Sequence, residues 1–539
     1  MRSVLLLIGT LVLYGSLVFQ LYGLQIKNGD YYATKAEAQN KVAGLLSPIR
    51  GGIYFTDKNG NASPAAINKE YPMIFAVPKD ITDPFATTEK LVSLLGVDRD
   101  ATIVALQKTN SQYKLLVRKA TAEQVDTIQS ADLRGIYVEE ERLRFYPKGK
   151  LVSQVIGFVA PSAEDSVLSG KYGIEAQYDT LLAGQPGKVE GDTITRPQAG
   201  GDVILTIDPT VQAKAEEVLQ NTITRFNATG GTVIVQDPNT GKILAMGNAP
   251  AFDPNNYKNY ELKDFMNPAV QAIYEPGSIF KVVTMAIGLD SKKITPDTTF
   301  VDTGSVTLDG RTIKNWDLKA HGRVTMTNVI EQSINTGAVY AMQQIGKDRF
   351  YNYVKQFGFQ SLTGIALPGE QAGSLGTLKT SFQDINFATA SFGQGVAVTP
   401  LQLITAVSAL ANGGQLMRPY ILSNVEPQVV RRVISEEAAR QVTEMMVSAV
   451  KKAEVAQIPH YRIAGKTGTA QIPDPKNGGY LESYIHTYVG FAPATQPKFV
   501  VLFKVDRPQA PLAGATVVPA FRELTEFLLN YYNVPPDNL

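Results

Sequence analysis

The stretch from Tyr274 to Ile287, YEPGSIFKVVTMAI, combines a serine and a lysine in a way that could support nucleophilic catalysis. Ser278 follows Pro276-Gly277, Lys281 comes three residues later, and an apolar run continues behind both. If this run is a helix, residues i and i+3 lie on one face, so the amine lies one turn from the hydroxyl. A neutral lysine in that place could accept the proton of a serine nucleophile. The alternative interpretation is the polar start of a buried helix.

Because an ordinary lysine is protonated at neutral pH, this chemistry requires that the site lower the pKa of Lys281. Burial or a second cation would lower it. Lys466 is the candidate cation, since AGKTGTA places it in a strand pattern whose flanking glycines let a backbone or ligand approach closely. In QSINTG, Ser333 supplies a hydroxyl that can pass a proton, and Asn335 supplies an amide that can orient a lysine or a substrate amide.

The Ser-x-x-Lys pattern occurs three times in the chain, and only its context separates the three copies. Ser111/Lys114 and Ser448/Lys451 lack both features of the Ser278 copy, the Pro-Gly turn that precedes the serine and the apolar helix pattern that follows it. Lys-Thr-Gly and Ser-x-Asn each occur once. The ordered set of three motifs therefore favours a catalytic site over a capped core helix, and it matches a known pattern of serine acyltransferases.

Composition and motif spacing argue against several other classes of function. The chain has 51 basic and 50 acidic residues and no block of Lys and Arg, so no footprint for nucleic acid is visible. Cysteine is absent, which excludes disulfides, thiolate metal sites and a cysteine nucleophile. The three histidines, His321, His460 and His486, lack metal-ligand spacing, so we expect no metal site and no cofactor. A phosphate-binding loop ending at Lys466 would require glycine where His460 stands.

Two further residues keep two interpretations each. His486 precedes a strand pattern beyond Lys-Thr-Gly, where it could line the cleft, although a structural histidine is the favoured interpretation. Trp316, the single tryptophan, could form part of a cleft wall or pack in the interior.

The N-terminus runs from Ser3 to Ile26 without a charged residue. A helix of that length spans roughly 36 Å, enough to cross a hydrocarbon core of about 30 Å. A cleaved signal peptide would have a shorter apolar region and a small-residue cleavage site, which are missing here. We therefore expect a membrane anchor over residues 1–26, with the rest of the chain on the extracytoplasmic face.

The remaining sequence divides into two patterns. Residues 27–205 alternate turn-rich stretches with short apolar runs and predict a folded spacer or docking domain. From Asp208-Pro209 onward, helical periodicity precedes the hairpin pattern GTVIVQDPNTGKILAM. Three more strand patterns and a helix close the chain, and the middle, 250–460, is mostly helical by pattern. We predict an α+β domain over residues 206–539, with a five-stranded antiparallel sheet, flanking helices and a large helical insert.

At this level the chain resembles the class B penicillin-binding proteins, monofunctional peptidoglycan D,D-transpeptidases of the division and elongation type. The resemblance rests on PIRGGIYFTDKNG, RFYPKGKLVSQVIGFV and YGIEAQYDTLLAGQPG before residue 206, and on YEPGSIFKVVT, FGFQSLTGIALPGE, FGQGVAVTPLQL, AGKTGTAQ and HTYVGFAP after it. It implies a serine transpeptidase domain of the β-lactamase type, preceded by a mixed α/β pedestal domain for dimerisation or docking and one transmembrane helix.

The resemblance also implies roles for particular residues. Ser278 would be the acylated nucleophile and Lys281 its general base, while Ser333 and Asn335 would pass protons and hold the donor peptide. Lys466 and Thr467, followed by Gly468, would hold the terminal carboxylate. The backbone N–H groups of Ser278 and Thr469 would form the oxyanion hole. The implied reaction is acylation by a D-Ala-D-Ala stem peptide, release of D-Ala and transfer to a neighbouring amine, with D-Ala-D-Ala carboxypeptidase activity as a possible side reaction.

Partners implied by the resemblance are peptidoglycan stem peptides, a membrane-embedded glycan polymerase, and proteins of the division or elongation machinery. Penicillins would trap the serine. Two departures stand out: Asp57 comes four residues after Ile53, where relatives usually have it two after, and Ile334 occupies a position where serine is frequent. The alternatives are a β-lactamase, which would hydrolyse its acyl-enzyme, and a catalytically silent scaffold or antibiotic sensor.

Overall fold

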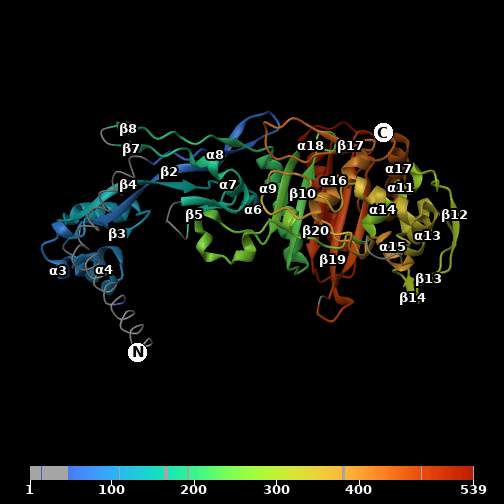
Figure 1. The fold of residues 1–539 in the computed structure, drawn as a ribbon, viewed down its shortest axis with the longest axis horizontal. Helices are drawn as coiled ribbons and strands as arrows, with labels where there is room; N and C mark the ends of the chain where they lie inside the picture. Colours follow the sequence, from blue (N-terminus) through green and yellow to red (C-terminus); the bar gives the residue numbers. More distant parts are fainter. Residues whose placement is uncertain are drawn as a thin grey trace, which may run out of the picture. The chain divides into compact units, whose positions relative to one another are not determined.

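The computed structural model describes Tyr14 and residues 47–108, 110–162, 168–190, 193–378, 383–474 and 476–537 (Figure 1). Backbone contacts divide the chain into two compact units. The smaller comprises Met1–Gly51, Ile67–Phe145 and Thr180–Gly201, and the larger comprises Gly52–Ala66, Tyr146–Asp179 and Asp202–Leu539. The larger unit thus includes three segments of the predicted pedestal, residues 52–66, 146–179 and 202–205, and the boundary at residues 205 and 206 stays a prediction.

The smaller unit contains an antiparallel sheet with three α-helices packed on it. It also includes η2 (Pro78–Asp80), the part of α8 (Asp179–Ala183) from Thr180 onward, and the hairpin of β7 (Lys188–Glu190) and β8 (Thr193–Thr195). The strands of the sheet are β2 (Ala62–Ala76, of which the part from Ile67 belongs here), β3 (Lys114–Val117) and β4 (Ile136–Phe145), and the helices packed on it are α3 (Pro84–Leu95), α4 (Arg99–Leu106) and α5 (Ala122–Ala131). Each helix begins at a capping side chain, namely Asp83, Asp98 and Thr121. A core cluster that includes Ile74, Leu91, Leu106, Ile128 and Ile136 joins the helices to the sheet.

A five-stranded antiparallel sheet forms the centre of the larger unit. Its order is β11 (Ile243–Ala249), β10 (Gly230–Gln236), β20 (Phe499–Asp506), β19 (Tyr480–Ala492) and β18 (Ala464–Pro473). Every residue of β10 is buried, as expected for a strand whose two faces are both covered. β18 lies at the edge of the sheet, so one of its sides is free to face other elements.

Helices cover both faces of this sheet. On one face, α9 (Pro209–Arg225) and α18 (Ala513–Tyr531) share a core cluster with Val233, Val235 and Phe503. Side chains alternate along a strand, so Gln236 points to the opposite face. There its Oε1 accepts a hydrogen bond of 3.0 Å from Ser408 on α16 (Pro400–Ala411). The sheet is therefore the middle layer of an α/β/α arrangement (Figure 1).

The long insert between β11 and β18 carries most of the helices of this unit. It contains α10 (Pro268–Gln271), η5 (Gly277–Ile279), α11 (Phe280–Asp290), β12 (Thr299–Asp302), β13 (Ser305–Leu308), β14 (Arg311–Lys314), β15 (Gly322–Thr325), α12 (Met326–Gln332), α13 (Asn335–Ile345), α14 (Lys347–Gln356), α15 (Asp384–Ala390), α16, β16 (Gln415–Met417), β17 (Val429–Arg432) and α17 (Glu436–Ala453). All residues from Phe280 to Leu289 are buried, so α11 is a central core helix. Any polar side chain on α11 is therefore withdrawn from water.

The rest of the larger unit comes from the earlier part of the chain. β1 (Ile53–Thr56) pairs with the first residues of β2 and in parallel with β9 (Val203–Ile204). The same part of the chain supplies α6 (Ser153–Ile156), β5 (Phe158–Pro161), β6 (Leu168–Lys171) and α7 (Gly173–Gln177). Two short 3-10 helices at the start of the insert, η3 (Pro254–Asn259) and η4 (Leu262–Phe265), pack against β5 and α6. Rings of Phe158, Phe252, Tyr257 and Phe265 pack together there.

The predicted sheet, its antiparallel order and the flanking helices are confirmed. Residues 250–460 were predicted to be mostly helical, but they also contain three short two-stranded ribbons, β12–β15, β13–β14 and β16–β17. Each strand has only three or four residues, too few to show an alternating pattern in the sequence. The membrane anchor predicted over residues 1–26 lies outside the described residues, apart from Tyr14. Among the described residues, no helix combines the length and apolar character needed to cross a bilayer.

Candidate active site

Ser278 lies in the 3-10 turn η5, immediately before α11. Gly277 has a φ of +57°, a conformation that glycine adopts without strain. Its N–H donates to the carbonyl of Gly393 at 3.1 Å, and a Cβ placed on it would come within 3.1 Å of Cβ of Ala470 on β18. The Pro-Gly turn therefore holds Ser278 against the edge strand, where the sequence predicted only a helix start.

Lys281 is completely buried on α11, one turn after Ser278. Its Nζ makes three hydrogen bonds, all to the second motif. They reach the carbonyl oxygen of Ser333 at 2.5 Å, Oγ of Ser333 at 3.1 Å and Oδ1 of Asn335 at 2.8 Å. The ordered set of motifs favoured a shared catalytic site, and these contacts bring the first and second motifs together.

The turn between α12 and α13 explains how two residues of one motif reach the same amine. Ser333 ends α12 in the left-handed conformation, with φ 56° and ψ 43°, and Asn335 begins α13. Because the chain reverses direction between them, the carbonyl and side chain of Ser333 and the side chain of Asn335 converge on Lys281. Non-glycine residues adopt this conformation uncommonly, and they do so mainly where the surroundings enforce it.

Lys466 on β18 approaches the same hydroxyl from the other side. Its Nζ lies 3.0 Å from Oγ of Ser333 and also contacts the carbonyl and hydroxyl of Thr467, at 3.1 and 3.3 Å. Only 4% of the Lys466 residue is exposed. The Ser333 hydroxyl thus lies between two buried amines, a position from which it can donate to one and accept from the other.

Burial and mutual repulsion set the charge of this pair of amines. Burial holds the pKa of Lys281 well below its ordinary value, and the nearby charge of Lys466 lowers it further. Burial alone lowers the pKa of Lys466 to about 7. Two protonated amines sharing one hydroxyl would repel each other in a low dielectric, so near neutral pH one of the two is neutral. Both shifts are in the direction that a neutral amine one turn from Ser278 requires.

Close packing between η5 and β18 depends on a second glycine. A Cβ on Gly468 would lie 2.8 Å from the carbonyl oxygen of Pro276, so no larger residue fits without a shift. Oγ1 of Thr469, the next residue, accepts from the N–H of Ala513 at 3.3 Å. An edge strand has backbone N–H groups without a partner strand, which is what an oxyanion hole requires. The pairing of the Ser278 and Thr469 N–H groups for that purpose stays a prediction.

The residues with open interpretations, His486 and Trp316, have no hydrogen bond to the buried amines of Lys281 and Lys466. His486 is buried, and its Nδ1 lies 2.9 Å from Oγ1 of Thr516 on α18, so it faces the helix layer. Burial lowers its pKa to about 4, which keeps the ring neutral. Trp316 is 55% exposed and donates from Nε1 to the carbonyl of Gln332 at 3.0 Å. His486 therefore has the environment of a structural histidine, whereas Trp316 lies beside the second motif and is not packed in the core.

The two other Ser-x-x-Lys copies have no comparable surroundings. Ser448 donates to Oε1 of Glu331 at 2.6 Å, and Ser111 donates to the carbonyl of Tyr113 at 3.2 Å. Ser111 belongs to the smaller unit, whose residues include none of the three motifs. The choice of Ser278/Lys281 among the three copies stays a prediction, and the surroundings of the other two differ from those of Ser278.

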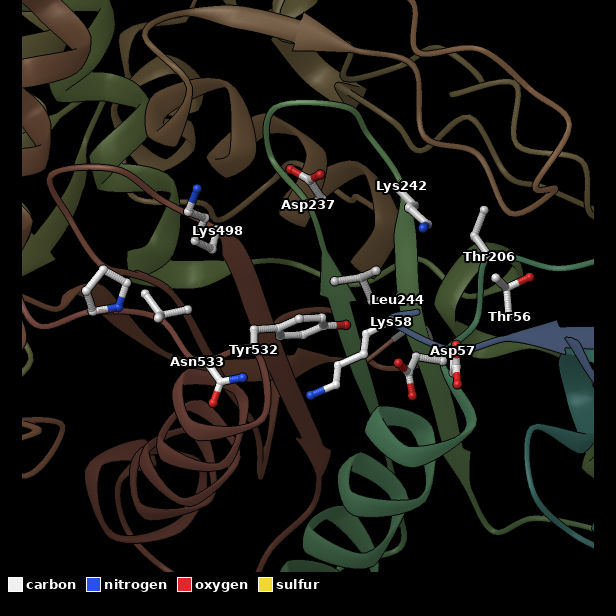
Figure 2. A pocket seen from close by; sticks show the side chains of 13 residues that line it. Thr56, Asp57, Lys58, Thr206, Asp237, Lys242, Leu244, Lys498, Tyr532 and Asn533 are labelled. Atoms are coloured by element: carbon white, nitrogen blue, oxygen red, sulfur yellow. The ribbon is translucent and has the colours of Figure 1, made fainter. Parts of the chain in front are cut away.

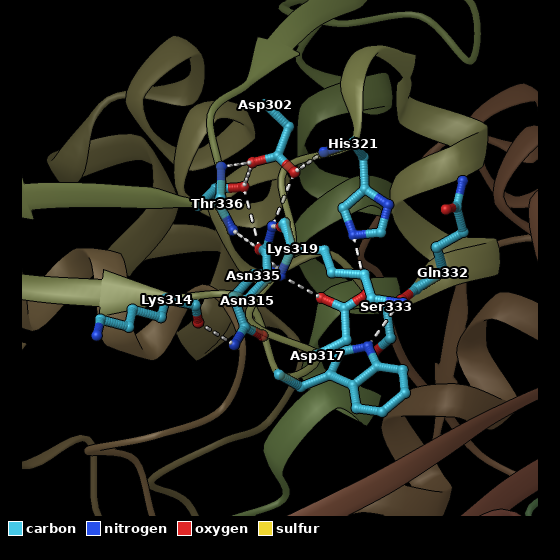
Figure 3. A network of polar contacts seen from close by, with 12 residues as sticks. Asp302, Lys314, Asn315, Asp317, Lys319, His321, Gln332, Ser333, Asn335 and Thr336 are labelled. Carbon is cyan, nitrogen blue, oxygen red and sulfur yellow. Dashed lines mark hydrogen bonds and ion pairs between the residues drawn. The ribbon is translucent and has the colours of Figure 1, made fainter.

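Sequence reasoning missed the residues that support the second motif. Asp302 and Asn315 lie in and between the short strands of the insert, and both bond to residues at the start of α13 (Figure 3). No local pattern could have revealed them, because each is a single polar residue in a stretch without helical or strand periodicity.

A cavity lies elsewhere, beside the turn between β10 and β11 (Figure 2). Its volume is about 410 Å³, and its charged lining residues are Asp57, Lys58, Asp208, Asp237, Lys242 and Lys498. The aspartates already accept hydrogen bonds within their own turns and helix start, and the lysine amines point in different directions. No group of His, Asp or Glu able to hold a metal ion occurs in the described part of the chain.

Comparisons with known proteins agree with this geometry. Residues 231–526 match the family model of the penicillin-binding protein transpeptidase domain, and residues 45–214 match that of the penicillin-binding protein dimerisation domain. The chain therefore belongs to the penicillin-binding proteins. Because it pairs these two domains along its length, it is a class B member of the family, as the motifs predicted.

Relatives and solved structures give the same result. The chain is 35% identical to stage V sporulation protein D of Bacillus subtilis over 505 residues, covering 88% of this chain and 76% of that protein. It is 30% identical to peptidoglycan D,D-transpeptidase FtsI of Escherichia coli, covering 96% and 89% of the two chains. The crystal structure of penicillin binding protein 3 from Mycobacterium tuberculosis, complexed with aztreonam, superposes with a TM-score of 0.70 at 26% identity and covers 91% of this chain and 98% of that one.

Proposed function

We propose that this protein is a serine D,D-transpeptidase that cross-links peptidoglycan, with Ser278 as its nucleophile. The observation that carries the proposal is the completely buried amine of Lys281, one turn from Ser278, with its hydrogen bonds directed to Ser333 and Asn335. The match to the transpeptidase domain and the likeness to a peptidoglycan D,D-transpeptidase at 30% identity support the same reaction.

The bonds of Lys281 explain how its lone pair becomes available. A neutral amine has two N–H bonds and one lone pair. The carbonyl of Ser333 and Oδ1 of Asn335 can only accept hydrogen bonds, so they occupy both N–H bonds. The lone pair is then left for a hydroxyl, either that of Ser333 or that of Ser278. Lys281 is therefore oriented to remove the proton when Ser278 attacks.

In the acylation step, Oγ of Ser278 attacks the carbonyl carbon of the penultimate D-Ala in a stem peptide. The proton of Ser278 passes to Lys281, and the peptide C–N bond breaks as the leaving amine of the terminal D-Ala receives a proton through Ser333. The backbone N–H groups of Ser278 and Thr469 would stabilise the oxyanion. An acceptor amine then attacks the ester, forms the new amide and returns a proton to Ser278.

Lys466 would bind the carboxylate of the terminal D-Ala, together with the hydroxyl of Thr467. Since the pKa of Lys466 is lowered to about 7 in the free protein, a bound carboxylate would favour its protonated form. Substrate binding would thus charge Lys466 and leave Lys281 neutral beside it. The same cation would receive the carboxylate of a penicillin, which acylates Ser278 as an imitation of the donor.

The finer assignments are also part of the proposal. Residues 1–26 would anchor the protein in the cell membrane, residues 27–205 would form the pedestal, and residues 206–539 would act on the extracytoplasmic face. Partners would include a membrane-embedded glycan polymerase and other proteins of cell division or elongation. The similarity to a peptidoglycan D,D-transpeptidase and to a stage V sporulation protein supports this part of the proposal.

The test uses the full-length protein in detergent with a pentapeptide donor that ends in D-Ala-D-Ala and a stem peptide acceptor. A transpeptidase forms one cross-linked peptide for each D-Ala that it releases in that reaction, and a carboxypeptidase side reaction would add D-Ala and the hydrolysed tetrapeptide. Mass spectrometry measures all of these products. A β-lactamase would hydrolyse a penicillin repeatedly and form no cross-link, and a silent scaffold would do neither. Either of these results would reject the proposal.

A further inference from the structure

The end of β14 and the loop that follows it contact the second motif at two places, Asn335 and Gln332 (Figure 3). The carbonyl of Lys314 accepts a hydrogen bond of 2.9 Å from Nδ2 of Asn335. This contact fixes which way the amide of Asn335 is turned, because its Oδ1 must then face Lys281. Two residues later along the loop, Nε1 of Trp316 donates to the carbonyl of Gln332 at 3.0 Å.

Asn315, between these two residues, caps the start of α13. Its Oδ1 accepts from the N–H of Asn335 at 3.1 Å and from the N–H of Thr336 at 3.2 Å. Ile334 occupies the usual capping position, and its apolar side chain cannot accept a hydrogen bond from these N–H groups. A side chain 20 residues earlier in the chain therefore satisfies the first N–H groups of the helix.

Asp302 fixes the orientation of Asn315. Nδ2 of Asn315 donates to Oδ2 of Asp302 at 2.8 Å, so its Oδ1 must face α13. The other oxygen of Asp302 accepts from Oγ1 of Thr336 at 2.7 Å, and the N–H groups of Gly304 and His321 complete the set at 2.9 Å each. Burial opposes the charge of Asp302, but these four donors together hold its pKa below the ordinary value.

We propose that Asp302 and Asn315 are positioning residues of the transpeptidase reaction, which hold the start of α13 so that Ser333 and Asn335 keep the amine of Lys281 aimed at Ser278. The hydrogen bonds of both side chains go to each other, to the start of α13 and to nearby backbone, and none goes to the amines of Lys281 and Lys466 or to the hydroxyls of Ser278 and Ser333. The inference rests on the proposed function, because it assigns a role in the activation of Ser278.

The physical argument is one of precision. The carbonyl of Ser333 and Oδ1 of Asn335 orient Lys281, and both belong to the turn between α12 and α13. In this turn Ser333 itself adopts the left-handed conformation, which is less favourable for serine than for glycine. If the cap on α13 is lost, the first helical N–H groups must find other acceptors, and the turn shifts. A misplacement of about 1 Å at a reacting group can lower a rate by about 100-fold.

The experiment measures acylation of the full-length protein by a fluorescent penicillin, separating the dissociation constant from the first-order acylation rate. Asn315→Ala and Asp302→Asn should each lower the acylation rate by about 100-fold, with the dissociation constant within a few-fold of wild type. Lys466 and Thr467 are unchanged in both variants, so carboxylate binding should persist.

Thr336 supplies a conservative pair of variants. Thr336→Val removes the hydroxyl that donates to Asp302 and keeps the shape, so the acylation rate should fall. Thr336→Ser keeps the hydroxyl, so most of the rate should return. Ser435→Ala is the matched control for a lost helix cap, because Ser435 caps α17 through the N–H of Ala438 at 3.3 Å. It should lower thermal stability and leave the acylation rate unchanged.

Several results would overturn the inference while leaving the proposed function intact. These are unchanged acylation rates in folded Asn315→Ala and Asp302→Asn, rates that fall equally in Thr336→Val and Thr336→Ser, or a comparable fall in Ser435→Ala. A wild-type protein that forms no adduct, or forms it away from Ser278, would instead reject the proposed function and the inference with it.

Discussion

Nζ of Lys466 lies 3.0 Å from Oγ of Ser333, a residue 133 positions earlier in the chain. The same hydroxyl is 3.1 Å from Nζ of Lys281, so one serine links the amines of the first and third motifs. A proton can therefore move along Lys281, Ser333 and Lys466 without leaving the buried site. This connection distinguishes the proposed active site from a polar helix start, and it leads to predictions that differ from motif to motif.

Ser278→Ala should abolish covalent labelling by a penicillin while the fold survives. If Ser278 only started the helix, its replacement by alanine would lower the free energy of unfolding by about 1 kcal/mol and leave covalent labelling unchanged. Intact mass spectrometry after incubation with the drug measures the adduct. Ser111→Ala and Ser448→Ala are matched controls from the other two Ser-x-x-Lys copies and should label normally. An adduct that persists on Ser278→Ala would refute the assignment.

The sequence predicted the parts of this site that depend on local patterns. Alternating and helical periodicity located the five strands of the sheet and α9 and α18. The motif order selected Ser278, Ser333 and Lys466 as candidates, and the structure brings Ser333 and Lys466 within hydrogen-bond distance of each other. The left-handed conformation of Ser333 was not predictable, because it follows from the reversal between two packed helices. Asn315 and Asp302 were missed since a cap supplied by a distant loop leaves no trace in the periodicity around α13.

Lys466→Ala should slow acylation by a penicillin far more than acylation by the methyl ester of the same penicillin. The free drug presents a carboxylate to the cation, whereas the ester does not, so only the free drug loses a charged hydrogen bond. Stopped-flow fluorescence gives both rates. An equal slowing for acid and ester would mean that Lys466 does not bind the carboxylate, and it would favour a role in proton transfer alone.

Gly277→Ala should impair both folding stability and acylation. Alanine at a φ of +57° costs about 1 to 2 kcal/mol, and its Cβ would press on Ala470 of β18 at 3.1 Å. Gly310→Ala is the matched control, because Gly310 also has positive φ, +75°, but an added Cβ there meets nothing within 4 Å. We expect a similar loss of melting temperature from the backbone in both variants, and slower acylation only in Gly277→Ala. Equal acylation rates in Gly277→Ala and Gly310→Ala would mean that acylation does not depend on the packing of the Ser278 turn against β18.

The second-order rate constant for acylation by a penicillin should fall as pH rises above about 7. This constant reports the ionisation of the free protein. Burial lowers the pKa of Lys466 to about 7, so the free protein loses this cation above that pH, and the drug carboxylate then meets a neutral amine. Burial and the nearby charge of Lys466 hold the pKa of Lys281 well below its ordinary value. Loss of a proton from Lys281 would supply the general base and raise the rate, so Lys281 does not cause the fall.

Lys466→Arg separates this effect from other ionisations. A guanidinium stays charged at every pH in the experiment, so the alkaline fall should disappear from the second-order constant, even if its absolute value is lower. At saturating drug the wild-type acylation rate should show the fall at higher pH, because a bound carboxylate favours the protonated amine. Rate profiles from about pH 6 to about pH 10 test both expectations. An alkaline fall that persists in Lys466→Arg would assign it to another group and remove Lys466 as the titrating cation.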